Sequence, residues 1–133
     1  MAMQVRVVCP EELVYEGEAA FVVVPTSDGE FGILARHASE ICTLERGYVR
    51  ICDDDPGTVS HTVAVNDGYV QVADDEVIIL ATRACDMAEV DADETRARLA
   101  SLEKRLAALP EDDPDRAYIE REASWAHLML KDE

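Results

Sequence analysis

Residues 1–85 alternate between short apolar runs and turns that are rich in Gly, Pro, Asn and Asp. The run 19–24 is rich in β-branched residues and ends at a proline, and the runs 62–65 and 69–73 flank an Asn-Asp-Gly turn. Asn and Asp before Gly supply the positive φ angles that tight hairpins need. Short runs with such frequent turn signals predict eight to ten antiparallel strands in a sandwich or flattened barrel.

The hydrophobic pattern changes near residue 88, where apolar positions begin to recur every three or four residues, as on one face of a helix. Asp91 is a suitable N-cap for this helix, with Glu94 as its capping-box partner, and Pro110 ends it. The apolar face of this predicted helix is made of leucines, namely Leu99, Leu102, Leu106 and Leu109.

A second helix is predicted to start at once, with Asp113 as the N-cap and Pro114 at the first helical position. Tyr118, Trp125 and Met129 lie on one side of it. Because the connection is short, the two helices should fold back antiparallel. We therefore expect an all-β sandwich domain over residues 1–87 and an antiparallel two-helix hairpin over residues 88–133.

The net charge of the chain restricts the classes of partner that it is expected to bind. The formal net charge is −17, from 12 basic and 29 acidic side chains. No basic stripe is available to neutralise phosphates, so nucleic acid is not an expected partner. No apolar run approaches the ~20 residues of a membrane helix, and we expect no direct membrane insertion. The four cysteines have no metal-binding spacing and no export signal opens the chain, so buried reduced thiols are expected.

Catalytic chemistry finds little support in the sequence. His37 precedes Ser39 and Glu40, which suggests a hydrolase, but no nucleophile elbow or oxyanion loop accompanies them. The acidic run 53–55 lacks the spaced ligands of a calcium loop and is typical of a solvated hairpin tip. We expect no catalytic residue and no metal site.

One segment is more specific. Residues 23–38 read Val-Val-Pro-Thr-Ser-Asp-Gly-Glu-Phe-Gly-Ile-Leu-Ala-Arg-His-Ala, which resembles the hallmark segment of the epsilon subunit of F-type ATP synthases. Residues 5–10, 14–17, 62–72 and 77–84 resemble other parts of that family in the same order. The chain departs from the family pattern at several loop positions, which are Ala35, Arg36, Ser39 and Asp67.

The resemblance implies a ten-stranded sandwich followed by a helical hairpin, and a non-catalytic rotor subunit in the central stalk. Its partners would be the gamma subunit, the ring of c subunits and, through the helices, the catalytic alpha/beta head. It would lie peripherally at the cytoplasmic face of the cell membrane, with the hairpin as a brake on ATP hydrolysis. The loop that contacts the ring would include Glu30, Phe31 and His37.

The family's nucleotide-binding motif has its best match at residues 92–97, where Ala92 replaces a larger apolar residue. Asp93, Arg96 and Ala97 would be the ATP-binding residues. Asp93 and Arg96 also share a helix face, so an intrahelical ion pair is an equal alternative. We expect no cofactor and at most weak ATP binding. The alternative function is a small nucleotide-sensing module that acts by opening and closing its helices.

Overall fold

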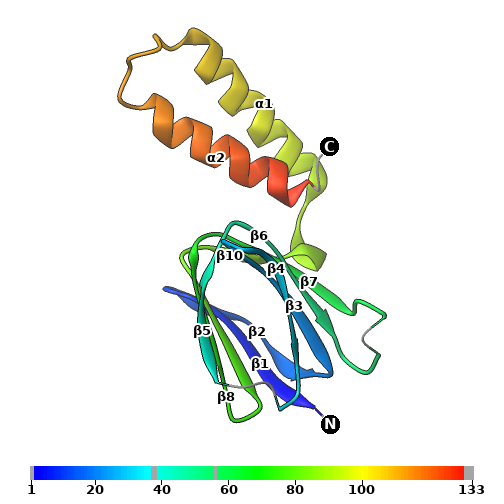
Figure 1. The fold of residues 1–133 in the computed structure, drawn as a ribbon. Helices are drawn as coiled ribbons and strands as arrows, with labels where there is room; N and C mark the ends of the chain where they lie inside the picture. Colours follow the sequence, from blue (N-terminus) through cyan, green and yellow to red (C-terminus); the bar gives the residue numbers. More distant parts are fainter. Residues whose placement is uncertain (1, 37–38, 56, 131–133) are drawn as a thin grey trace. The chain divides into compact units, whose positions relative to one another are not determined.

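The computed structural model describes residues 2–36, 39–55 and 57–130. It divides into two compact units, Met1–Glu89 and Val90–Glu133 (Figure 1). The described part of the first unit forms ten strands and one short 3-10 helix, and that of the second forms two helices. The predicted fold class is therefore confirmed.

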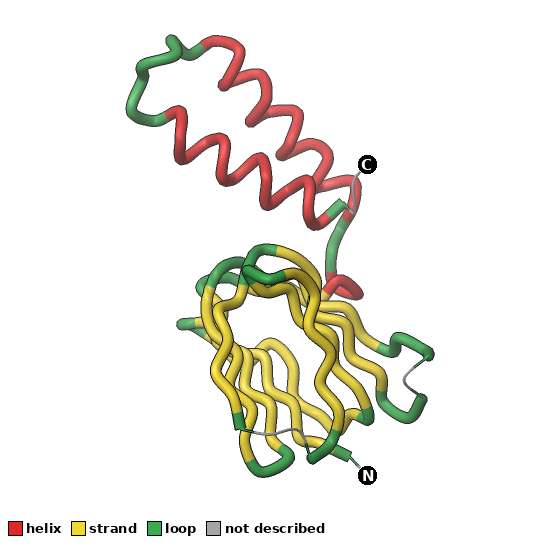
Figure 2. The backbone as a smooth tube through the Cα atoms, in the orientation of Figure 1, coloured by secondary structure: helices red, strands yellow, loops and turns green. Residues whose placement is uncertain are grey.

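The strands curl around a single interior, as the yellow segments of Figure 2 show. Their order in the sheet is β10-β7-β6-β3-β5-β8-β9-β1-β2, and β4 pairs with the free side of β3. The elements of this unit are β1 (Met3–Cys9), β2 (Glu12–Ala19), β3 (Phe21–Thr26), β4 (Gly29–Leu34), β5 (Glu40–Leu44), β6 (Gly47–Cys52), β7 (His61–Val65), β8 (Gly68–Ala73), β9 (Glu76–Ala81), β10 (Ala84–Asp86) and the 3-10 helix η1 (Met87–Glu89).

The sheet departs from the predicted antiparallel pattern in one place. Strand β1 runs parallel to β9, with Val5 opposite Val77 and Val7 opposite Ile79. All the other pairings among the described residues are antiparallel. The parallel pair joins the first strand to the ninth and brings residues about seventy positions apart into one core.

The core of this unit is built from β-branched residues that alternate with outward-facing positions, because successive side chains of a strand point to opposite faces. Val5 and Val22, together with Ile79 on β9, are completely buried. Since few aromatic residues are present in the chain, Val, Ile, Leu and Ala supply most of the buried apolar surface.

Strand β2 runs through Gly17 and continues to Ala19. The hydroxyl oxygen of Tyr15 lies 2.8 Å from the position that a Cβ of residue 17 would take. Gly17 therefore makes room for the Tyr15 side chain and does not end the strand. Strand β10 follows β9 after a bend at Thr82 and Arg83.

The second unit consists of α1 (Ala92–Ala108) and α2 (Arg116–Met129), which pack as a hairpin. Asp91 caps α1 as predicted, since its carboxylate accepts a hydrogen bond from the Glu94 N–H at 3.0 Å. The core between the two helices is small and consists of Leu99, Leu102, Ile119, Ala123, Ala126 and Leu130.

The predicted start of the second helix is wrong by two residues. Residue Asp115, and not Asp113, precedes the first helical residue of α2, and Asp115 makes no side-chain cap. Asp113 still organises the approach, because its carboxylate accepts a hydrogen bond from the Asp115 N–H at 2.9 Å. Residues 113–116 thus form a tight turn that leads into the α-helix.

Candidate interaction surfaces

The turn before β4 is held by Thr26. Its hydroxyl donates a hydrogen bond to the Gly29 carbonyl at 2.6 Å and accepts one from the Asp28 N–H at 3.3 Å. Gly29 has a φ of 105°, a conformation that residues with a side chain rarely adopt. This turn fixes the start of β4, where two of the predicted ring-contact residues, Glu30 and Phe31, follow directly.

The two residues point to opposite faces of β4. Phe31 is half-buried and packs against the core, while Glu30 is exposed. The Glu30 carboxylate pairs with the guanidinium of Arg50 on β6. Of these two residues, Glu30 is therefore the one that presents a charged group at the surface, and Phe31 anchors the strand beneath it.

The third predicted contact residue, His37, lies outside the described residues. Its neighbour Arg36 has a φ of 67°, and the Arg36 N–H donates a hydrogen bond to the Asp75 carboxylate at 2.5 Å. The turn before β4 and the loop after it lie at opposite ends of this six-residue strand. Six residues span about 20 Å. The predicted contact residues therefore flank both ends of β4, and the role of His37 stays a prediction.

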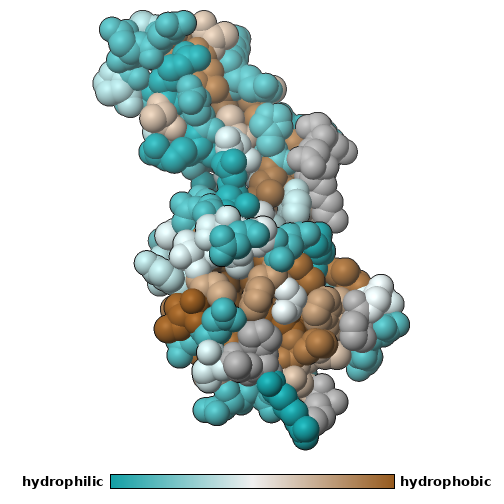
Figure 3. Space-filling model, in the orientation of Figure 1, coloured by the Kyte–Doolittle hydropathy of each residue, from teal (hydrophilic) through white to brown (hydrophobic). Residues whose placement is uncertain are grey.

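A surface that the sequence analysis missed is an apolar row on the outer face of the sheet formed by β5, β8, β9, β1 and β2. Tyr69 on β8 lies opposite Leu80 on β9, which lies opposite Val8 on β1, which in turn lies opposite Leu13 on β2. Tyr69 is 60% exposed and Leu80 is 46% exposed. We call these four residues the apolar row. The space-filling view shows brown apolar surface on the strand-bearing unit (Figure 3).

Charged residues lie farther along three of the same strands. Arg6 on β1 pairs with Glu16 on β2 at 2.8 Å and with Glu76 on β9 at 3.1 Å. The hydrogen bond to Glu16 and the charge of Glu76 raise the pKa of Arg6. The outer face of this sheet therefore combines an apolar row with a polar border, an arrangement typical of protein interfaces.

The predicted ATP-binding residues lie on the exposed side of α1. The Arg96 guanidinium contacts the Asp93 carboxylate at 2.5 Å, and Ala97 is exposed next to them. The ion pair that the sequence left as an alternative is thus formed. On the facing helix, Arg116 donates to the carbonyl of Leu106 at 3.1 Å and also pairs with Glu120.

A histidine and a carboxylate meet at the junction of β2 with β7. The His61 ring lies 4.9 Å from the Tyr15 ring, and its Nε2 lies 3.4 Å from the Asp53 carboxylate. Burial, followed by the charges of Asp53 and Asp86, raises the pKa of Tyr15. The nearby run 53–55 forms a hairpin tip, in which the Asp55 carboxylate accepts from the Gly57 N–H at 2.9 Å.

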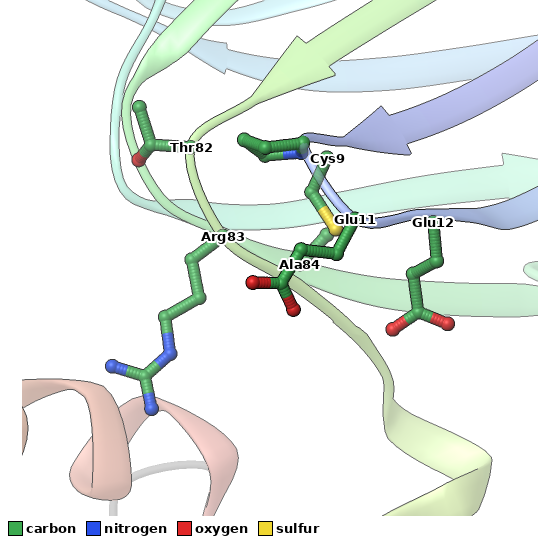
Figure 4. Close-up of a pocket in the computed structure, with 7 residues that line it drawn as sticks. Cys9, Glu11, Glu12, Thr82, Arg83 and Ala84 are labelled. Atoms are coloured by element: carbon green, nitrogen blue, oxygen red, sulfur yellow. The ribbon is translucent and has the colours of Figure 1, made fainter.

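An open pocket of about 300 Å³ lies between the β1–β2 turn and the segment after β9. Figure 4 shows Glu11 and Glu12 on one side and Thr82 and Arg83 on the other. The pocket thus offers charges of both signs on an open surface.

Within the described residues, no three His, Cys, Asp or Glu side chains gather closely enough to hold a metal ion. No helix in the described part of the chain is long and apolar enough to cross a membrane.

Comparison with known proteins identifies the family. Residues 2–87 match the family model described as "ATP synthase, Delta/Epsilon chain, beta-sandwich domain". The chain is 35% identical over 125 residues to the ATP synthase epsilon chain of Rubrobacter xylanophilus. The aligned region covers 94% of this chain and 84% of that protein. It is 35% identical over 128 residues to the epsilon chain of Rhodospirillum centenum, covering 96% and 85%.

The fold agrees with solved structures. A chain in the Euglena gracilis mitochondrial ATP synthase superposes with a TM-score of 0.68 at 17% identity, covering 98% of this chain and 78% of that chain. A chain in the Tetrahymena thermophila mitochondrial ATP synthase does so with a TM-score of 0.60 at 19% identity, covering 98% and 96%.

A ten-stranded sandwich joined to a helical hairpin, with this family match, defines a delta/epsilon-type subunit, and the chain belongs to the ATP synthase delta/epsilon family. Within that family its relatives are epsilon chains. It is accordingly a non-catalytic, epsilon-type subunit of an ATP synthase.

Proposed function

We propose that this subunit links the gamma subunit to the ring of c subunits at the cytoplasmic face of the membrane. The observation that carries the proposal is that one rigid strand unit offers two different surfaces. One is the apolar row across β8, β9, β1 and β2. The other is the Glu30 end of β4, a strand that pairs with β3 and lies off the strand path that carries the row. A linker between two partners needs two such surfaces.

We assign the apolar row to the gamma subunit. Contiguous exposed apolar patches with a polar border mark protein–protein contacts on soluble domains. The row crosses four hydrogen-bonded strands, so it spans about 14 Å at the usual strand spacing. Since the strands beneath it have completely buried inner positions, the row is presented on a rigid base.

The test is a charge placed in the middle of the row. Leu80→Asp should raise the dissociation constant for isolated gamma subunit at least tenfold, because a carboxylate would be buried there without a partner. Val59→Asp is the control, since Val59 is similarly exposed at 48% but lies in the β6–β7 connection. Unchanged binding of Leu80→Asp would remove the assignment.

We assign the c-ring contact to Glu30. It carries the exposed charge at the start of β4, and loops and strand ends on a rigid scaffold are common binding sites. Glu30→Lys should reduce the coupling of proton flow to ATP synthesis in reconstituted membranes. Glu18→Lys, a reversal at an exposed acid of β2, should leave coupling intact. Equal coupling in the two variants would contradict this contact.

The hairpin is proposed to act as a weak brake on ATP hydrolysis through the alpha/beta head. Its second helix carries few cations, and Arg116 is already engaged by Glu120 and by carbonyls of α1. A helix with few cations would be repelled by an acidic surface of the head, and such repulsion lowers the affinity of the contact. Deleting residues 110–133 should therefore change the ATPase activity of the assembled complex by less than about twofold, whereas a large activation would show a strong brake.

The alternative function, nucleotide sensing, predicts tight ATP binding that this chain is not expected to have. Asp93 neutralises Arg96, and Ala97 is exposed on the same turn. We expect a dissociation constant in the millimolar range, which corresponds to a binding free energy of about −4 kcal/mol. Isothermal titration calorimetry with Mg-ATP is the measurement. Micromolar binding that is lost in Arg96→Ala would favour the sensor function.

A further inference from the structure

The ion pair between Arg50 and Glu30 crosses a whole strand. Glu30 lies opposite Pro25 on one side of β3, and Arg50 lies opposite Val23 on the other side. Two strand spacings, about 10 Å, separate β4 from β6. Only long side chains reach across that distance, so the pairing is a specific bridge over the outer face of β3.

The bridge constrains a strand that has little other support. Among the described residues, β4 is paired with β3 alone. The Glu30 side chain remains 57% exposed and the Arg50 side chain 36% exposed. Without a partner, an exposed glutamate at a sheet edge would sample several rotamers. The guanidinium of Arg50 selects those in which the carboxylate is drawn over β3.

The strand unit is also strongly acidic, which makes a paired glutamate at this place informative. Residues 1–90 contain 5 basic and 17 acidic side chains. One of the few arginines is thus used to hold Glu30, and the two apolar residues beneath the bridge, Val23 and Pro25, are only half-exposed. The local surface is an oriented ion pair on an apolar floor.

We propose that Arg50 is a positioning residue for the ring contact: it fixes the Glu30 carboxylate in the orientation that the c ring recognises, an inference that rests on the proposed contact of Glu30 with the ring. Glu30 remains the residue that touches the partner, and Arg50 acts through it. Fixing the side chain before binding removes part of the entropy that binding would otherwise cost.

The experiment is a double-mutant cycle on the full-length chain. ATP synthase depleted of this subunit is titrated with labelled chain, and the dissociation constant is measured for Arg50→Gln, Glu30→Gln and the double variant. Arg50→Gln should weaken binding about two- to fivefold, the effect of losing a partly exposed ion pair. The double variant should bind no more weakly than Glu30→Gln alone.

Three further variants separate positioning from a structural role. Arg50→Lys keeps the charge and should recover most of the affinity lost in Arg50→Gln. Arg98→Gln, which removes an ion-paired arginine of the hairpin, should not change the dissociation constant. The charge swap Glu30→Arg with Arg50→Glu restores a bridge but reverses the charge presented to the ring, so it should still bind weakly. Melting temperatures of all variants should stay within a few degrees of one another.

The outcomes are distinct. If Glu30→Gln binds normally, the proposed ring contact fails and the role of Arg50 fails with it. If Glu30→Gln weakens binding but Arg50→Gln does not, the ring contact stands and only the positioning role is overturned. Additive losses in the double variant, or full affinity in the charge swap, would also overturn it, because each would mean that Arg50 acts independently of the orientation of Glu30.

Discussion

The two units of the chain are stabilised in different ways. Among its described residues, the strand unit has a core of seventeen buried apolar side chains, most of them with no exposed surface. The helical hairpin has six, nearly all slightly exposed, and adds polar contacts between its helices, such as the 2.7 Å pair of Arg98 with Glu122. The strand unit therefore depends mainly on apolar burial, and the hairpin depends in larger part on directional polar contacts.

The largest expected difference appears when the units are separated. A truncated chain of residues 1–87 should give a cooperative melt and β-type circular dichroism, because its core is complete. An isolated peptide of residues 88–133 should lose most of its helicity, since short helices with a small shared core are marginal in water. A noncooperative melt of residues 1–87, or full helicity of the peptide, would mean that the comparison is wrong.

The next effect separates the inner and outer faces of one strand. Ile79 is completely buried on β9, and its neighbour Leu80 points outward in the apolar row. Ile79→Ala should lower the free energy of unfolding by about 3–5 kcal/mol through lost burial and a cavity. Leu80→Ala should change it by less than about 0.5 kcal/mol. Urea titration followed by circular dichroism measures both, and similar losses would refute the assignment of the two faces.

A smaller effect is expected at the closed end of the hairpin. Arg116 donates to the carbonyls of Leu106 and Leu109 at the end of α1. Arg116→Ala should destabilise the hairpin by about 0.5–1.5 kcal/mol. Arg121→Ala, an exposed arginine of the same helix, should have less effect. Trp125, the single tryptophan of the chain, is buried in α2 and reports hairpin unfolding by fluorescence.

The smallest effect concerns the start of α1. Asp91→Ala removes the cap on the Glu94 N–H and should destabilise the hairpin by about 1 kcal/mol or less. Asp91→Asn keeps a capping oxygen and should recover most of the loss. If Trp125 fluorescence gave the same urea midpoint for Asp91→Ala as for the parent chain, the cap would contribute nothing measurable.

The fold could be predicted where local rules decide it. Turn residues and β-branched runs placed most strands, and Asp91 with its leucine face placed α1. The parallel pairing of β1 with β9 could not be predicted, because it depends on which distant strands share a sheet edge. The role of Gly17 in accommodating Tyr15 could not be predicted either, since it depends on the position of a side chain two residues away.

The candidate surfaces were predicted less completely. Glu30 stood out through its motif, but its pairing with Arg50 depends on the order of β4, β3 and β6 in the sheet. The apolar row combines one residue from each of four strands, so no single window of sequence contains it. Tyr69 and Leu80 are a partial signal, because each is apolar at an outward-facing position of its strand.

The parallel β1–β9 pairing also has a consequence for synthesis. Strand β1 pairs at once with β2, but its other edge must wait until residues 76–80 have been made. At typical elongation rates of 5–20 residues per second, the delay is roughly 3–14 s. During that interval the newly made β1–β2 pair has an unpaired edge on β1, which is a template for association with other chains. The ribosome-bound chain is thus most vulnerable to aggregation before its ninth strand emerges.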